Sequence, residues 1–136
     1  LDIALIAGRF TLLDQVAQHE LFPYALANKI DISMGGVLNS GVLANPVAGA
    51  TYNYLPASDE VIARAAKIGN FLKERGIPLV AAALQFPLRH PAVTSVLTGP
   101  RTAAELRSNA EDFNRPIPDT IWSELEDAGL IEKIQA

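Results

Sequence analysis

Apolar residues along the chain form short runs, separated by longer stretches in which they recur at helical spacing. The short runs have the length of β-strands and cover 3–7, 30–37 and 94–98. The first run lacks a clean alternation, as expected of a strand buried on both faces. Helical patterns cover 13–29, 58–75, 78–86, 102–112 and 119–128. The order βαβααβαα predicts a parallel sheet with right-handed crossovers.

Residues at the ends of these patterns predict where the helices begin and end. Ser58 is a good N-cap and Gly76 ends the helix that follows it. Pro23 lies within the first helical pattern, where we expect it to break or kink the helix. In that helix we expect four inward positions: Val16, Leu21, Tyr24 and Ala25. Residues 45–56 hold Gly, Pro, Asn and two tyrosines and predict a long surface loop, typical of functional segments.

A parallel sheet of only three apolar strands leaves strand edges and helix faces without partners. The chain also opens with Leu1 inside an apolar run. We therefore expect residues 1–136 to be one part of a larger α/β domain whose N-terminal half lies outside this chain. An autonomous small α/β domain without a cofactor is the alternative.

Composition excludes several classes of function. The 136 residues are 49% hydrophobic and 19% charged, with a formal net charge of −4. This balance gives no electrostatic case for nucleic acid or an anionic membrane as a partner. The chain has no cysteine, and its two histidines, His19 and His90, are far apart, so we expect no metal site. No apolar run has the roughly 20 residues that span a bilayer, and no signal peptide is visible, so we expect a cytoplasmic location.

Two segments carry candidate chemistry, and the first follows the second predicted strand. Residues 37–43 read Val-Leu-Asn-Ser-Gly-Val-Leu. A small loop containing Gly41 lets backbone N–H groups approach an anion such as a pyrophosphate. Alternatively, Gly41 only satisfies the backbone angles of a turn.

The second segment is a strand, then Gly99, then a helix starting near Thr102. A helix N-terminus favours a phosphate, and Arg101 adds a positive charge there. Asn109 offers a donor and an acceptor that suit the edge of an adenine ring. Alternatively, Glu105 only completes a capping box with Thr102, and Asn109 is a solvent-exposed helix residue. Since both segments follow parallel strands, we expect them side by side at one end of the sheet.

With these segments in place, essentially the whole chain resembles the aldo/keto reductases. The matching landmarks are 9–15 (Arg-Phe-Thr-Leu-Leu-Asp-Gln), 37–43, 97–102 with Ser108-Asn109, and the terminal helix with Trp122, Leu125 and 129–131. The resemblance implies an α/β fold, the C-terminal portion of a TIM (β/α)₈ barrel, with the three strands as its sixth to eighth. Residues 10–15 and 51–54 look closest to the bacterial sugar-dehydrogenase branch, which includes L-fucose and D-threo-aldose dehydrogenases.

The resemblance also implies site residues. The pyrophosphate would be held by the backbone of Leu38, Asn39, Ser40 and Gly41. The adenosine end would be held by Gly99, Arg101, Glu105, Ser108 and Asn109. The family's catalytic Asp, Tyr, Lys and His come from earlier strands, so we assign no catalytic residue here.

Three departures from the family pattern affect the expected cofactor. Gly35 stands where relatives often have an aromatic residue against the nicotinamide, and Ala7 where many have a glutamine. Glu105 stands where NADP-preferring relatives have Arg or Gln. A carboxylate repels a 2′-phosphate and accepts a hydrogen bond from a 2′-hydroxyl, so we predict NAD, with NADP as second choice. Arg101 argues the other way, because it could pair with a phosphate.

Three aromatic residues are candidates for the substrate pocket: Phe10, Tyr52 and Tyr54. A core role for Phe10 is an equal alternative. For the tyrosines we weigh the pocket against a lid over the cofactor and against simple loop packing. Trp122, with Leu125 on an amphipathic helix, should pack against the barrel.

The resulting functional expectation concerns the complete barrel. It is an NAD(P)-dependent dehydrogenase or reductase acting on a small sugar or related aldehyde or alcohol, with an aldose or fucose oxidised to a lactone. The present chain supplies the pyrophosphate and adenosine side of the site and should be inactive alone. The alternative is a non-catalytic nicotinamide-binding barrel, a redox sensor or scaffold.

Overall fold

The computed structural model describes residues 1–135 and contains one parallel sheet and one small hairpin. The parallel strands are β1 (Ile3–Ala7), β2 (Asp31–Gly35) and β5 (Val93–Val96), in the order β1-β2-β5. The hairpin pairs β3 (Thr51–Tyr52) with β4 (Leu55–Pro56). The predicted parallel sheet is confirmed, whereas the hairpin lies in the segment that we predicted as irregular loop.

Within residues 1–135, five α-helices and three short 3₁₀ turns connect or follow these strands. The helices are α1 (Leu21–Ala27), α2 (Asp59–Lys73), α3 (Leu79–Gln85), α4 (Ala103–Phe113) and α5 (Thr120–Asp127). The 3₁₀ turns are η1 (Val16–Gln18), η2 (Asn39–Gly41) and η3 (Phe86–Arg89). The predicted order of strands and helices is confirmed.

Capping residues explain where α2 and α4 begin. The Ser58 hydroxyl accepts a hydrogen bond from the amide of Val61 at 3.3 Å. The Thr102 hydroxyl accepts one from the amide of Glu105 at 3.1 Å. Each bond satisfies one of the amides that a helix start leaves free. Gly76, with φ of +73°, follows the end of α2 as predicted.

The first predicted helix is wrong in its extent. The chain from Gly8 to Glu20 is a loop with one 3₁₀ turn, buried over most of its length, and α1 begins only at Leu21. Pro23 therefore lies in the first turn of α1, where the missing N–H costs nothing, and it does not break the helix. Two of the four predicted inward positions, Val16 and Tyr24, are exposed, while Ala25 is buried.

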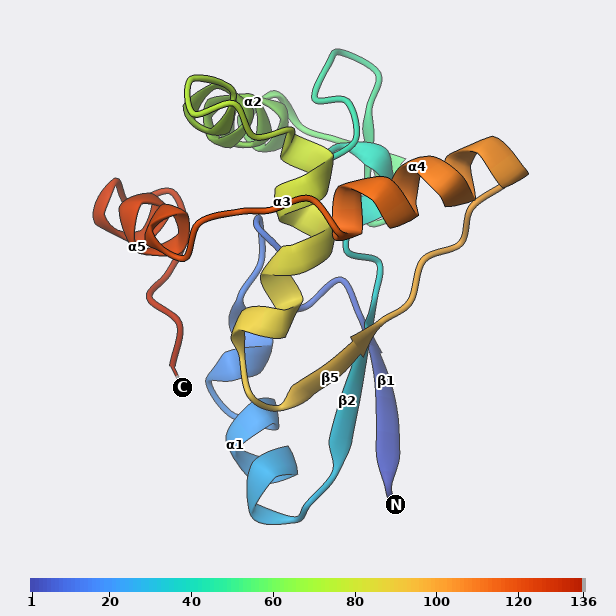
Figure 1. The fold of residues 1–136 in the computed structure, drawn as a ribbon, viewed down its shortest axis with the longest axis vertical. Helices are drawn as coiled ribbons and strands as arrows, with labels where there is room; N and C mark the ends of the chain where they lie inside the picture. Colours follow the sequence, from blue (N-terminus) through green and yellow to red (C-terminus); the bar gives the residue numbers. More distant parts are fainter. Residues whose placement is uncertain (136) are drawn as a thin grey trace.

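The core lies between one face of the sheet and the helices. In Figure 1, α1 and α3 lie to one side of the strands. Ile32 and Met34 of β2 point into this core. Trp122 and Leu125 of α5 are buried there as predicted, and the ring of Trp122 lies 6.1 Å from that of Phe86.

The opposite face of the sheet carries apolar side chains in contact with solvent. Ile3 and Leu5 of β1 are 54% and 59% exposed, so β1 is not buried on both faces in this chain. Beside them, Ser33 and Ser95 join β2 to β5 through a hydroxyl hydrogen bond of 2.8 Å. A sheet that curves into a barrel has such a second, inward face.

Parallel pairing brings the loops after all three strands to the same end of the sheet. Ala7 pairs with Gly35, and Met34 pairs with Val96. In Figure 1 the three strand arrows point toward this end, where α4 and the η2 turn lie. Among residues 1–135, no helix is long and apolar enough to cross a membrane. The cytoplasmic location stays a prediction.

Candidate functional site

One cavity of about 790 Å³ opens at the carboxyl ends of the strands. Most of its lining residues come from two segments that are about sixty residues apart in sequence. All nine residues expected around the phosphates and the adenosine line it: Leu38, Asn39, Ser40, Gly41, Gly99, Arg101, Glu105, Ser108 and Asn109. Its size falls within the roughly 300–1,000 Å³ of small-molecule sites. The expected juxtaposition of the two segments is therefore present in the structure.

The turn after β2 has an unusual backbone. Asn39, Ser40 and Gly41 have φ angles of +48°, +63° and +117°. Such left-handed angles are costly for residues other than glycine and concentrate at functional sites. The amide of Asn39 donates to the carbonyl of Gly36, and that of Gly41 to the carbonyl of Leu38. Of the four amides expected at a pyrophosphate, two are thus already used within the turn, which leaves those of Leu38 and Ser40 as candidates.

Asn39 has a second unusual property, in its side chain. The residue is only 2% exposed, and neither its amide nitrogen nor its amide oxygen has a hydrogen-bond partner among the described residues. A Cβ built on Gly8 would lie 3.9 Å from that nitrogen, so the side chain reaches the end of β1. Buried polar atoms without partners are rare and costly, and they are expected where a ligand or a water completes the site.

The hairpin is attached to the η2 turn through Ser40. The Ser40 carbonyl accepts a hydrogen bond from the Thr51 hydroxyl, and the Ser40 hydroxyl accepts one from the amide of Tyr54 at 3.0 Å. The amide of Val42 donates to the Thr51 carbonyl at 3.2 Å. These bonds fix the hairpin at the rim of the cavity.

One face of α4 forms the opposite wall. Glu105, Ser108, Asn109 and Asp112 line the cavity, and their spacing of three and four residues places them on one side of a helix. No residue of α4 is buried. Asp112 also pairs with Arg115, at 3.5 Å.

Glu105 and Arg101 form a closed pair at the start of α4. The Glu105 carboxylate accepts hydrogen bonds from the Arg101 backbone amide at 2.7 Å and from the Arg101 guanidinium at 2.9 Å. The backbone bond, followed by the bond from the side chain, lowers the pKa of Glu105. The capping box is only half formed, since Thr102 caps the Glu105 amide while the carboxylate binds Arg101.

The three aromatic candidates have different surroundings. Phe10 is fully buried, and its ring centroid lies 4.9 Å from those of Phe22 and Phe86. The ring is enclosed by the aromatic core, which is the alternative that we gave for Phe10, and its place in a substrate pocket stays a prediction. Tyr52, in strand β3 of the hairpin, packs against the core and does not line the cavity. Tyr54 does line it, and is 89% exposed.

Several lining residues were not predicted from the sequence. Gly8 and Gly36 form the floor, where a Cβ on Gly36 would come within 3.0 Å of the Gly8 nitrogen. Asn53 comes from the tip of the hairpin and Val80 from α3. The sequence offered one signal for these two lining residues, because Gly8 and Gly36 each directly follow a strand.

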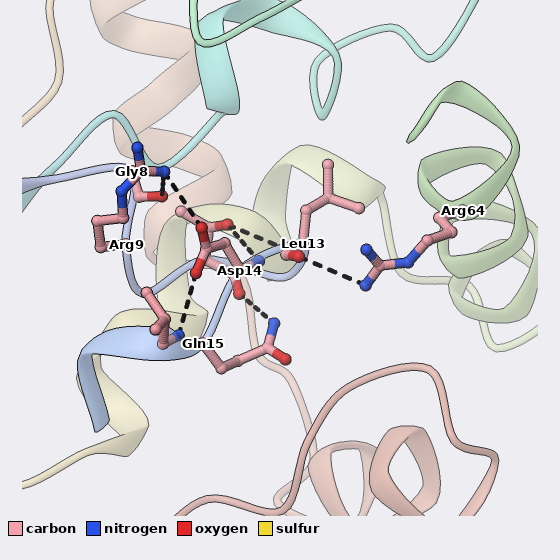
Figure 2. A network of polar contacts seen from close by, with 8 residues as sticks. Gly8, Arg9, Leu13, Asp14, Gln15 and Arg64 are labelled. Atoms are coloured by element: carbon pink, nitrogen blue, oxygen red, sulfur yellow. Dashed lines mark hydrogen bonds and ion pairs between the residues drawn. The ribbon is translucent and has the colours of Figure 1, made fainter. Parts of the chain in front are cut away.

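A polar network holds the loop that follows β1 (Figure 2). The Arg9 guanidinium contacts the Asp14 carboxylate at 3.2 Å, and the Gln15 amide donates to the carbonyl of Thr11 at 2.6 Å. Arg64 of α2 reaches the carbonyl of Leu13 at 3.4 Å. This network anchors the loop whose first residue, Gly8, forms part of the cavity floor.

Comparison with known proteins identifies the class. Residues 1–129 match the model of the aldo/keto reductase family, and the chain belongs to this family of oxidoreductases. It is 44% identical over 132 residues to pyridoxal 4-dehydrogenase of Microbacterium luteolum. This match covers 96% of this chain and 39% of that protein. It is 40% identical over 133 residues to D-threo-aldose 1-dehydrogenase of a Pseudomonas species, covering 96% and 40%.

The chain thus spans about two fifths of the length of these curated relatives. Its three parallel strands with covering helices have the α/β fold class expected for the C-terminal portion of a (β/α)₈ barrel. In such barrels the carboxyl ends of the strands carry the active site. The cavity lies at this end.

The lining of the cavity has features that suit a polar ligand. The cavity extends from α4 to the end of β1, since residues of both line it. Gly99 has open space where a side chain would stand, and Asn39 holds an unpaired donor and acceptor. A polar, elongated ligand would satisfy both features.

Proposed function

We propose that this chain forms the pyrophosphate and adenosine side of a nicotinamide-dinucleotide site in an oxidoreductase. The observation that carries the proposal is the shared cavity, in which the η2 turn faces one side of α4. Sheet order supports an orientation for the cofactor. With the adenosine on α4, after β5, and the pyrophosphate at η2, after β2, the nicotinamide half extends toward β1.

The bound cofactor would supply hydride transfer, and the residues of this chain would hold it in place. The side chains of Ser108 and Asn109 would bind the adenosine from the wall formed by α4. The η2 turn would contribute the amides of Leu38 and Ser40 to the pyrophosphate. The Asn39 amide would complete its hydrogen bonds with a polar group of the ligand.

We propose that NAD is preferred over NADP. The free positive charge of Arg101 would be the main argument for a 2′-phosphate, but in this structure Glu105 neutralises it. Both Glu105 oxygens already accept from Arg101, but a carboxylate oxygen can accept a second hydrogen bond, here from a 2′-hydroxyl, whereas a 2′-phosphate would have to compete with Glu105 for Arg101. The pair stands at the expected adenosine end of the cavity.

Glu105→Gln in the full-length protein tests this preference by titration with NAD and NADP. We expect the ratio of the NADP to the NAD dissociation constant to fall about tenfold, because the variant removes a carboxylate near the phosphate and releases the Arg101 guanidinium to pair with it. Glu111→Gln, an exposed carboxylate on the same helix, is the matched control and should leave the ratio unchanged. An unaltered ratio in Glu105→Gln would mean that Glu105 only stabilises the start of α4.

For the substrate we propose a small sugar or related aldehyde or alcohol, with oxidation of an aldose such as fucose to its lactone. The names of the two relatives, an aldose dehydrogenase and a pyridoxal dehydrogenase, support this class. Following NADH formation with L-fucose, other aldoses and pyridoxal tests it. Tight NAD binding without turnover of any of these substrates would favour a non-catalytic nicotinamide-binding barrel. Residues 1–136 alone should bind NAD weakly, since they hold one side of the site.

A further inference from the structure

The hairpin tip has a backbone that does not suit its sequence. Tyr52 pairs with Leu55, so Asn53 and Tyr54 form a two-residue turn, and their φ angles are +51° and +63°. Positive φ at both positions defines a type I′ turn, for which Asn-Gly is the preferred pair. Tyrosine therefore occupies the position where glycine is favoured, and a bulky residue is a clear outlier at such angles.

The position of this tyrosine gives the unfavourable residue a function. Tyr54 lines the cavity, is 89% exposed, and its amide donates to the Ser40 hydroxyl at 3.0 Å. The ring is thus attached to the same turn that would hold the pyrophosphate. An exposed aromatic ring can bury apolar area when a ligand covers it, and backbone strain of this kind concentrates at ligand-binding sites.

The turn also reaches toward the end of β1. A Cβ built on Gly8 would lie 3.9 Å from the amide oxygen of Asn53. In the sheet order β1-β2-β5, Gly8 follows β1, and α4 follows the strand at the other edge. The tip therefore lies over the part of the cavity away from the adenosine wall.

We propose that Tyr54 is a fixed aromatic lid that packs against the nicotinamide half of the bound dinucleotide. The inference rests on the proposed cofactor site and adds a residue that determines affinity for one half of the ligand. Planar rings stack on aromatic side chains whatever their substituents, so contact with the ring, and not the tyrosine hydroxyl, carries the effect.

The test uses the full-length protein with Tyr54→Gly, Tyr54→Asn and Tyr54→Phe. Glycine and asparagine both tolerate the left-handed backbone, so either provides a folded variant without the ring. Lys29→Gly is the matched control for the backbone, because Lys29 has φ of +55° and does not line the cavity. Thermal unfolding and the dissociation constants of NAD and of AMP, which represents the adenosine half alone, are measured for each.

We expect Tyr54→Gly to raise the melting temperature by a few degrees, as Lys29→Gly does. It should weaken NAD about tenfold, or about 1.4 kcal/mol, while AMP binding stays unchanged and Tyr54→Phe binds like the wild type. Unchanged NAD affinity in the ringless variants overturns the lid, as does equal weakening of NAD and AMP. A raised KM for the carbonyl substrate alone would place the ring at the substrate. If the wild type binds neither NAD nor NADP, the cofactor site itself is wrong.

Discussion

Two sets of buried amide side chains in this structure differ completely in their hydrogen bonding. Gln15 and Gln18 are 5% and 0% exposed, and both make hydrogen bonds with the C-terminal segment. Asn39 is 2% exposed and makes none among the described residues. The same functional group thus links two segments through hydrogen bonds in the glutamines and makes no hydrogen bond in Asn39.

The glutamines explain how the end of the chain is fixed. The Gln15 amide oxygen accepts from the amide of Glu132 at 3.1 Å, and that of Gln18 accepts from the amide of Gln135 at 3.0 Å. The Gln18 nitrogen donates to the carbonyl of Lys133 at 3.3 Å. A satisfied buried amide stabilises the folded state, whereas an unsatisfied one destabilises it until a ligand binds.

The largest effect on stability should come from Gln18→Ala. The substitution leaves the carbonyl of Lys133 and the amide of Gln135 without these partners, at a cost of about 2 kcal/mol in the free energy of unfolding. Urea unfolding of the full-length protein measures it. Asn28→Ala removes an exposed amide that bonds the carbonyl of Tyr24, and should cost about 0.5 kcal/mol or less. Equal losses in the two variants would contradict a connecting role for Gln18.

Asn39→Gly should weaken NAD binding and leave stability almost unchanged, which is the reverse of what we expect for Gln18→Ala. Glycine accepts the φ of +48° and removes the unpaired amide, so the free energy of unfolding should change by less than about 1 kcal/mol. The dissociation constant of NAD should rise about tenfold, because the ligand loses its hydrogen bonds to the side chain. Gln18→Ala should leave that constant unchanged. A large loss of stability with unchanged NAD binding would make Asn39 a structural residue like the glutamines.

We expect the smallest effect on stability from the titration of His90. This buried side chain makes its hydrogen bonds in the neutral form. Its Nδ1 accepts from the amide of Ala92 at 3.1 Å, and burial lowers its pKa, partly offset by a hydrogen bond to the backbone of Gln135. The unfolded state therefore binds a proton more readily. Stability should be full above about pH 6.5 and decrease as the pH falls toward the lower pKa of the folded state.

Urea unfolding between pH 8 and pH 5.5 measures this decrease. His90→Asn keeps an acceptor for the amide of Ala92 and removes the titrating group, so its stability should depend less on pH. An equal slope in the variant would assign the dependence to other groups.

The sequence predicted the helices that have local signals. Ser58 and Thr102 mark the starts of α2 and α4 through bonds that their own side chains make. The first helix was mispredicted in extent because buried apolar residues of the preceding loop, Leu13 and Ala17, lie four residues apart and imitate helical spacing. The hairpin was missed because strands of two residues have no periodicity to detect.

The site was predictable as two segments, and its details were not. Parallel strands place their following loops at one end, which brought Ser40 and Arg101 into one cavity. The pairing of Arg101 with Glu105 and the unpaired amide of Asn39 depend on side-chain geometry that spacing does not encode. The left-handed Tyr54 follows from the register of the hairpin, which no local pattern specified.

The most direct test of the shared cofactor cavity is amide hydrogen exchange of the full-length protein with and without NAD. The account predicts slower exchange on binding in both 36–44 and 99–112, the two walls of the cavity. Saturating NAD that leaves exchange in both segments unchanged would contradict it.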